Sequence, residues 1–163
     1  MKTSCFSALR FAVAALSLSF VSVAASAQDT APALTAYYGV KDALVATDAA
    51  KAKAQATSLT AALSKVEAAK LSAADKKALM MAKTHAAAIG KSTDVDDQRA
   101  QFEMLSTSMI SLAKATKPAK SYVQFCPMAA NGKGASWLSD KKEVRNPYYG
   151  DKMLKCGSVK EVI

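Results

Sequence analysis

The stretch DVDDQRAQFEMLSTSMISLAKATKP, residues 94–118, decides the fold of this chain. Core-type side chains recur in it at spacings of three and four, as on one face of an α-helix: Val95, Gln98, Phe102, Leu105, Met109 and Leu112. Asp94 or Thr93 is a suitable N-cap, and Lys117-Pro118 ends the helix because the residue before a proline disfavours helical backbone. The stretch therefore predicts a long amphipathic helix that buries one face.

Three shorter helices are expected upstream, and the same spacing defines them. The first spans residues 33–46 and ends near Thr47-Asp48, and the second spans residues 49–69. The third follows the capping sequence Ser72-Ala-Ala-Asp75 and stops at Gly90 in a left-handed conformation. The expected buried seams of the second and third helices are Ala52, Ala56, Leu59, Leu63 and Val66, then Leu79, Ala82, Ala86 and Ile89. Short turns favour an antiparallel four-helix bundle over residues 31–116.

The last part of the chain, residues 117–163, has a different character. Tyr122 to Phe125 is a short β-type run, and Gly, Pro and Asn then recur at turn spacing. We expect a small irregular or β-hairpin cap on the bundle, anchored by Trp137 and the Tyr148-Tyr149 pair.

Residues 1–27 have the pattern of a secretory signal peptide. Lys2 and Arg10 precede and border an apolar run, and the triplet Ala25-Ser26-Ala27 forms an A-x-A cleavage site. The run is shorter than the roughly 20 residues of a membrane-spanning helix. We expect cleavage after Ala27, a single domain over residues 28–163, a periplasmic or secreted location, and no membrane span after cleavage.

The basic residues are unevenly distributed. Residues 114–163 carry ten basic and four acidic side chains, whereas residues 28–113 carry ten and nine. A basic patch can indicate nucleic acid, but the expected export and the absence of an interleaved aromatic platform argue against it. Two interpretations of these basic residues remain: they form a solvated surface, or they bind an anionic partner outside the cytoplasm.

Sulfur side chains are concentrated in the cap. Export discards Cys5, so two cysteines remain, and each has a methionine nearby: Cys126 with Met128, and Cys156 with Met153. Thiolates and thioethers select soft ions such as Cu(I), and Lys152 and Lys155 are expected to favour the thiolate. The same two cysteines can instead form a disulfide, as is common in exported proteins. Closing about 30 residues, that bridge would contribute roughly 3.5 kcal/mol.

His85 is the only histidine, and Met81 lies four residues before it on the same helical face. The two side chains are a secondary candidate for a metal site, against the alternative of an ordinary interhelical histidine. Met80, Met104 and Met109 are expected to fill gaps in the core. There is no phosphate loop, nucleophile elbow or HExxH motif, so we expect no enzyme activity, no catalytic residue and no organic cofactor.

Several short motifs resemble a known bacterial envelope family, domain of unknown function 3347. They are Tyr122–Ala129 (YVQFCPMA), Trp137–Ser139, Arg145–Gly150 (RNPYYG) and Lys152–Gly157 (KMLKCG), with Tyr38–Val45 and Gln98–Phe102 upstream. The resemblance extends over about residues 37–159. It implies that the protein acts in metal resistance in the bacterial envelope, since members also occur fused to adaptor subunits of heavy-metal efflux systems.

The Cys126-Pro-Met128 sequence also resembles the opening of short heavy-metal-binding modules in such adaptors, although Ala129 stands where those modules have histidine. The sulfur ligands favour Cu(I) or Ag(I) as the ion, and the resemblance implies an efflux adaptor subunit as a partner. Of that module's ligands, only Cys126, Met128, Met153 and Cys156 can be carried over. The expected function is soft-metal binding or buffering, and the alternative is a disulfide-stapled interaction module without metal.

Overall fold

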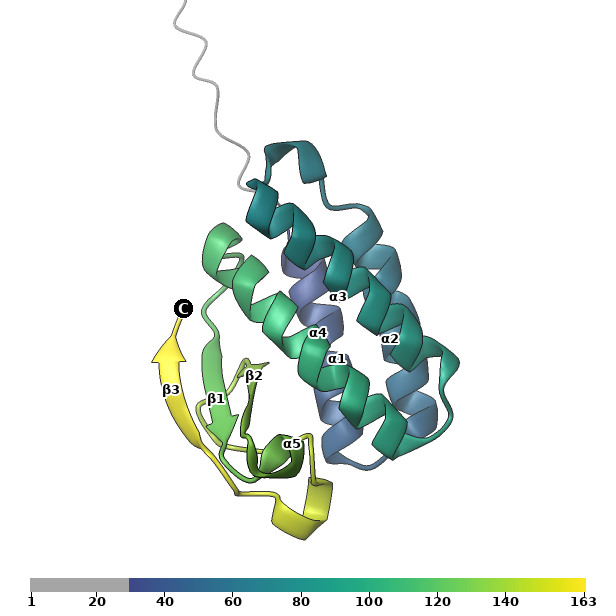
Figure 1. Ribbon diagram of the computed structural model, residues 1–163, viewed down its shortest axis with the longest axis vertical. Coiled ribbons are helices and arrows are strands. Elements are labelled where there is room, and N and C mark those ends of the chain that lie inside the picture. Colours follow the sequence, from purple (N-terminus) through teal and green to yellow (C-terminus); the bar gives the residue numbers. More distant parts are fainter. Residues whose placement is uncertain (1–29) are drawn as a thin grey trace, which may run out of the picture.

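A computed structural model describes residues 30–163, and Figure 1 shows how their helices and strands are arranged. The four long helices are α1 (Ala31–Val45), α2 (Ala49–Ser64), α3 (Ala73–Lys91) and α4 (Val95–Thr116). The cap contains the strands β1 (Tyr122–Cys126), β2 (Ala135–Ser139) and β3 (Ser158–Val162) and the short helices α5 (Ala129–Gly132) and η2 (Gly150–Met153). The prediction of a mainly helical fold is confirmed. The predicted signal peptide lies outside the described residues.

Side-chain caps start three of the long helices where the sequence predicts them. Asp48 accepts the Lys51 N–H at 2.9 Å, and the Ser72 hydroxyl accepts the Asp75 N–H at 3.2 Å. Asp94 accepts two N–H groups of α4, both at 2.9 Å. These bonds satisfy backbone donors that have no partner within the helix.

Two predicted helix ends are wrong. The helix α2 ends at Ser64 instead of residue 69, and a separate short helix, η1 (Ala68–Lys70), follows. Val66 and Leu71, which flank η1, are both buried, so this segment still contributes apolar side chains to the core after the helix ends.

Gly90 does not end α3, which continues to Lys91, and its backbone is not left-handed. A Cβ atom at Gly90 would lie 3.3 Å from the Thr57 hydroxyl oxygen of α2. The missing side chain therefore allows α2 and α3 to approach closely instead of providing a stop.

Each long helix packs chiefly on its neighbours in the sequence, and α1 touches α4 only lightly. The predicted seams of α2 and α3 are buried throughout. Met109 fills the core as expected, but that prediction is wrong for Met80 and Met104, which are 59% and 46% exposed.

The cap is a three-stranded antiparallel sheet in the order β2-β1-β3. The expected hairpin is β1 with β2, paired from Tyr122 opposite Ser139 to Cys126 opposite Ala135. The strand β3 was not predicted and forms the outer edge of the sheet in Figure 1. Its register with β1 is irregular and leaves Lys160 as an extra residue, so a bulge and a lysine occupy the edge.

The cap and the helices share one hydrophobic cluster, which contains Trp137 and Leu138 of β2 together with residues of all four long helices. Tyr37 of α1 is fully buried at the junction, where its phenol oxygen lies 2.7 Å from the Ser106 hydroxyl of α4 and accepts the Leu138 N–H at 3.1 Å. Its ring stacks on Phe102 with centroids 5.2 Å apart. One polar side chain thus connects three elements.

Within residues 30–163, none of the helices has the length and the apolar character needed to cross a bilayer.

Candidate thiol and metal centre

The two cysteines of the cap lie next to each other although 30 positions separate them in the sequence. Cys126 is the last residue of β1 and is fully buried, whereas Cys156 is partly exposed and precedes β3. Their sulfur atoms are 2.6 Å apart, and both are free thiols. Both hypotheses for this pair, a shared ion and a disulfide, require such proximity.

Asn146 and Gly157 hold the Cys156 backbone in place. The buried Asn146 side chain donates to the Cys156 carbonyl at 3.0 Å and accepts the Tyr148 N–H at 2.8 Å. Gly157 has φ 137°, and a Cβ atom there would lie 2.8 Å from the Phe125 carbonyl oxygen. The spacing of Gly, Pro and Asn predicted turns in this part of the chain but did not indicate that Asn146 positions a thiol.

The thiol of Cys156 does not behave as its lysine neighbours suggested. Its pKa is raised, chiefly by the hydrogen bond with the Cys126 thiol and further by burial and by the charge of Cys126. The expectation that Lys152 and Lys155 favour the thiolate is therefore wrong for the dithiol form, because sharing a proton with the neighbouring sulfur opposes ionisation. A metal ion must displace that proton in order to bind.

Both methionines of the predicted site adjoin Cys156 through the backbone. The Met128 N–H interacts with the Cys156 thiol, and the Met153 carbonyl accepts the Cys156 N–H at 2.9 Å. Met128 is 53% exposed, and its carbonyl accepts a hydrogen bond from the Tyr149 hydroxyl at 2.5 Å. Residues 30–163 hold no cluster of three or more His, Cys, Asp or Glu side chains suited to a metal. Within the described residues, the cysteine pair therefore has no third ligand of these four types.

His85 and Met81 lie on α3, whose main contacts are α2 and α4, and the structure does not bring them to the cysteines. The His85 Nδ1 atom lies 2.8 Å from the Gln101 Oε1 atom of α4. Its Nε2 atom is buried and has no hydrogen-bond partner among the described residues.

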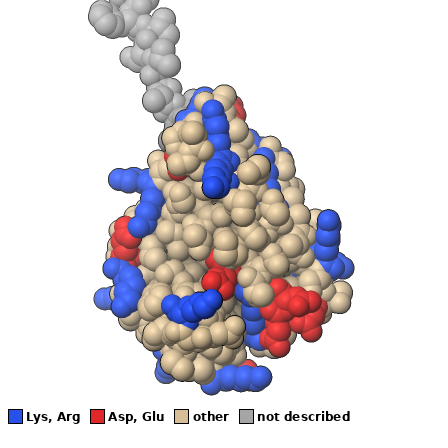
Figure 2. All heavy atoms as spheres, viewed as in Figure 1, with Lys and Arg blue, Asp and Glu red and all other residues tan. Residues whose placement is uncertain are grey.

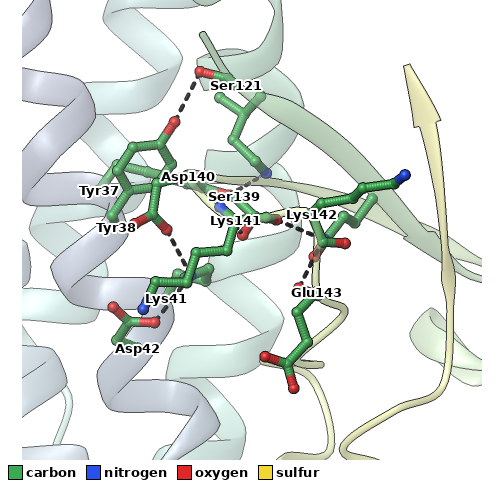
Figure 3. Close-up of polar contacts among 12 residues, drawn as sticks. Tyr37, Tyr38, Lys41, Asp42, Ser121, Ser139, Asp140, Lys141, Lys142 and Glu143 are labelled. Carbon is green, nitrogen blue, oxygen red and sulfur yellow. Dashed lines mark hydrogen bonds and ion pairs between the residues drawn. The ribbon is translucent and has the colours of Figure 1, made fainter. Parts of the chain in front are cut away.

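A buried lysine joins α1 to the cap, and the sequence reasoning missed it. The Lys41 ammonium lies 2.9 Å from Asp42 and 3.4 Å from Asp140, and its side chain is 4% exposed. Figure 3 shows this group reaching from α1 to the loop that follows β2.

The Gln124 amide of β1 also holds that loop. It donates to three successive carbonyls, those of Lys141, Lys142 and Glu143, at 3.0–3.2 Å. A pocket of about 160 Å³ borders Lys41 and the loop.

Arg99 forms a second connection between the helices and the cap. Its guanidinium donates to the Pro147 carbonyl at 3.1 Å, to the Leu44 carbonyl at 3.2 Å and to the Thr47 hydroxyl at 3.0 Å. It also pairs with Asp96 at 3.2 Å. Lys41 and Arg99 both belong to the upstream motifs of the resemblance, which was the only signal for either residue.

A family model described as "Protein of unknown function (DUF3347)" matches residues 33–121. The match covers the helices and ends before β1, so the cap motifs that carried most of the resemblance lie outside it. No curated protein and no solved structure matches the chain. Because the family match covers more than half of the 163 residues, the chain belongs to the DUF3347 family of proteins of unknown function.

Proposed function

We propose that this protein is an exported, non-enzymatic protein that binds a soft monovalent ion, Cu(I) or Ag(I), through Cys126 and Cys156. Met128 and Met153 are the proposed thioether ligands. The observation that carries the proposal is the 2.6 Å separation of the two thiol sulfurs at a partly exposed position of the cap. The scaffold that we propose is an antiparallel four-helix bundle, a description supported by the short connections between consecutive helices.

The chemistry of the ligand set supports a soft ion over a hard one. Two thiols and two thioethers offer only sulfur, which favours Cu(I) and disfavours Mg²⁺ or Ca²⁺. Metal–thiolate bonds of about 2.3 Å would place the sulfurs up to about 4.6 Å apart. The thiols must therefore separate when the ion enters, and the partly exposed Cys156 is the one with room to move.

The setting that we propose is metal resistance outside the cytoplasm, with handover of the ion to an efflux adaptor subunit. The signal-peptide pattern of residues 1–27 and the family resemblance support it. No nucleic acid is part of this proposal.

An anaerobic titration of the reduced protein with Cu(I), in competition with a chromogenic chelator, tests the proposal. The tightest site is expected to be lost in Cys126→Ser and Cys156→Ser and to be weakened by about tenfold in Met128→Leu. Met80→Leu is the matched control, because Met80 is similarly exposed but lies on α3. A tightest site with the same affinity in Cys126→Ser as in the wild type would refute metal binding by this pair.

The short sulfur–sulfur distance also favours a second candidate, a disulfide-stapled interaction module without metal. A separation of 2.6 Å is nearer to the bond length of about 2.05 Å than to the spacing of two sulfurs on one ion. The basic cap would then dock on an acidic partner. Lys133, Lys152 and Lys155 are exposed and form no ion pair with another residue of the described range.

Counting free thiols and metal on one sample, isolated without reductant, separates the two candidates. Two thiols with one bound ion support the metal protein, whereas no free thiol and no metal support the staple. In the second case, reduction is expected to lower the free energy of unfolding by roughly 3.5 kcal/mol.

A further inference from the structure

We propose that His85 and Met81 of α3 form a second soft-metal site beside α4, separate from the cysteines, in which the His85 Nε2 atom and the Met81 sulfur are the ligands. The proposal stands apart from the proposed function, because it uses no residue of the cap. It rests on the hydrogen bonding of one imidazole ring and on helical geometry.

The hydrogen bond to Gln101 fixes the tautomer of His85. An amide oxygen only accepts, so the Nδ1 atom that lies 2.8 Å from the Gln101 Oε1 atom carries the hydrogen. The Nε2 atom of the neutral ring then presents a lone pair, which is the form that binds metal. Histidines that ligate metals commonly donate their other N–H to a carbonyl or carboxylate in this way.

The lone pair of Nε2 has no other use in the described part of the chain. The atom is buried and lacks a hydrogen-bond partner there, an arrangement that is costly for a polar group. A cation bound to Nε2 would satisfy it. Buried polar atoms without partners are uncommon enough to require an explanation, and this one belongs to a strong metal ligand.

Helical spacing places Met81 on the same face of α3 as His85. It precedes His85 by one helical turn and is partly buried, and side chains on a helix lean toward its N-terminus. The imidazole therefore leans over the turn that carries Met81. One nitrogen and one thioether sulfur make a soft pair suited to Cu(I) or Ag(I) and unsuited to Mg²⁺ or Ca²⁺.

Titration with Ag(I), which needs no reductant, tests the site in the Cys126→Ser/Cys156→Ser double variant. This variant should bind one Ag(I), and adding His85→Gln or Met81→Leu should weaken binding by at least about tenfold. Met80→Leu, one residue away but on another side of the helix, should leave the affinity unchanged. Equal effects of Met81→Leu and Met80→Leu would overturn the proposal.

Nitrogen NMR of the imidazole gives a readout that does not depend on the variants. In both the wild type and the double variant, Ag(I) should shift the His85 Nε2 resonance strongly while Nδ1 remains protonated. An unchanged Nε2 resonance at saturating Ag(I) would overturn the site. Because the double variant contains no thiol of the cap, failure here leaves the Cys126–Cys156 proposal untouched, and failure of that proposal leaves this one untouched.

Discussion

Tyr37 is a single polar side chain that helps to fix the position of the cap on the helices. Its hydroxyl is buried between α1, α4 and β2 and takes part in hydrogen bonds with Ser106 and Leu138. Replacing Tyr37 by phenylalanine keeps the ring but leaves those two groups without a partner in the core. We expect Tyr37→Phe to lower the free energy of unfolding at neutral pH by about 1–3 kcal/mol, measured by urea denaturation.

The same residue gives an alkaline pH dependence with a defined sign. Burial raises the pKa of Tyr37 far above its ordinary value, while in the unfolded chain the phenol ionises near pH 10. Above about pH 10 the folded state retains a proton that the unfolded state loses, so the free energy of unfolding falls as pH rises, by about 1.4 kcal/mol per pH unit for each such tyrosine. Burial also raises the pKa of Tyr148. Tyr37→Phe should therefore reduce this slope without abolishing it, and an unchanged slope would contradict the assignment.

At the scale of elements, Arg99 links α4 to the end of α1 and to the cap loop. Its planar guanidinium serves three acceptors from segments far apart in the sequence: Leu44, Thr47 and Pro147. Lysine keeps the charge but has three donors on one nitrogen, instead of the five that the guanidinium spreads over three nitrogens in a rigid plane. We expect Arg99→Lys to cost about 1–3 kcal/mol of stability by urea denaturation.

Arg145→Lys is the control for this substitution, because Arg145 is exposed and lies in the cap. Its effect should stay within about 0.5 kcal/mol. Equal losses of unfolding free energy in the two variants would show that the hydrogen bonds of the Arg99 guanidinium add no stability beyond that of an exposed arginine.

The helices could be predicted from sequence because their signals are local. The spacing of apolar residues identified the seams, and Asp48, Ser72 and Asp94 marked the caps. The end of α2 and the role of Gly90 could not be predicted, because each depends on how another element packs. The strand β3 was missed because SVKEV is short and charged and pairs with a segment more than 30 residues earlier.

In the candidate sites too, features with a local sequence signal could be predicted, and features that depend on tertiary contacts could not. Spacing placed the sulfur residues in one segment, and Met81 and His85 on one helical face. It gave no sign that Lys41 is buried against Asp140, 99 residues away, or that the Cys156 thiol shares a proton with Cys126. Such contacts depend on tertiary structure that no local pattern encodes.

At the scale of the whole molecule, the charged side chains on the surface are scattered, whereas the buried apolar side chains form one continuous cluster. Figure 2 shows basic side chains around much of the rim of the viewed face and acidic ones gathered in fewer places. The apolar cluster, in contrast, is continuous from the helices into the sheet. The cap and the helices therefore share one interior.

A shared interior predicts that the cap and the helices unfold together. The only tryptophan, Trp137, is fully buried in β2, whereas most of the helical backbone belongs to α1–α4. Tryptophan fluorescence thus reports on the cap, and far-UV circular dichroism reports on the helices. In urea under reducing conditions, which removes any contribution of a disulfide, the two transitions should coincide, as expected for a two-state unit. A fluorescence transition at clearly lower urea would mean that the Tyr37, Lys41 and Arg99 contacts only dock a separately folding cap. In that case, Arg99→Lys should shift the fluorescence transition alone, whereas in a cooperative unit it shifts both transitions by the same amount.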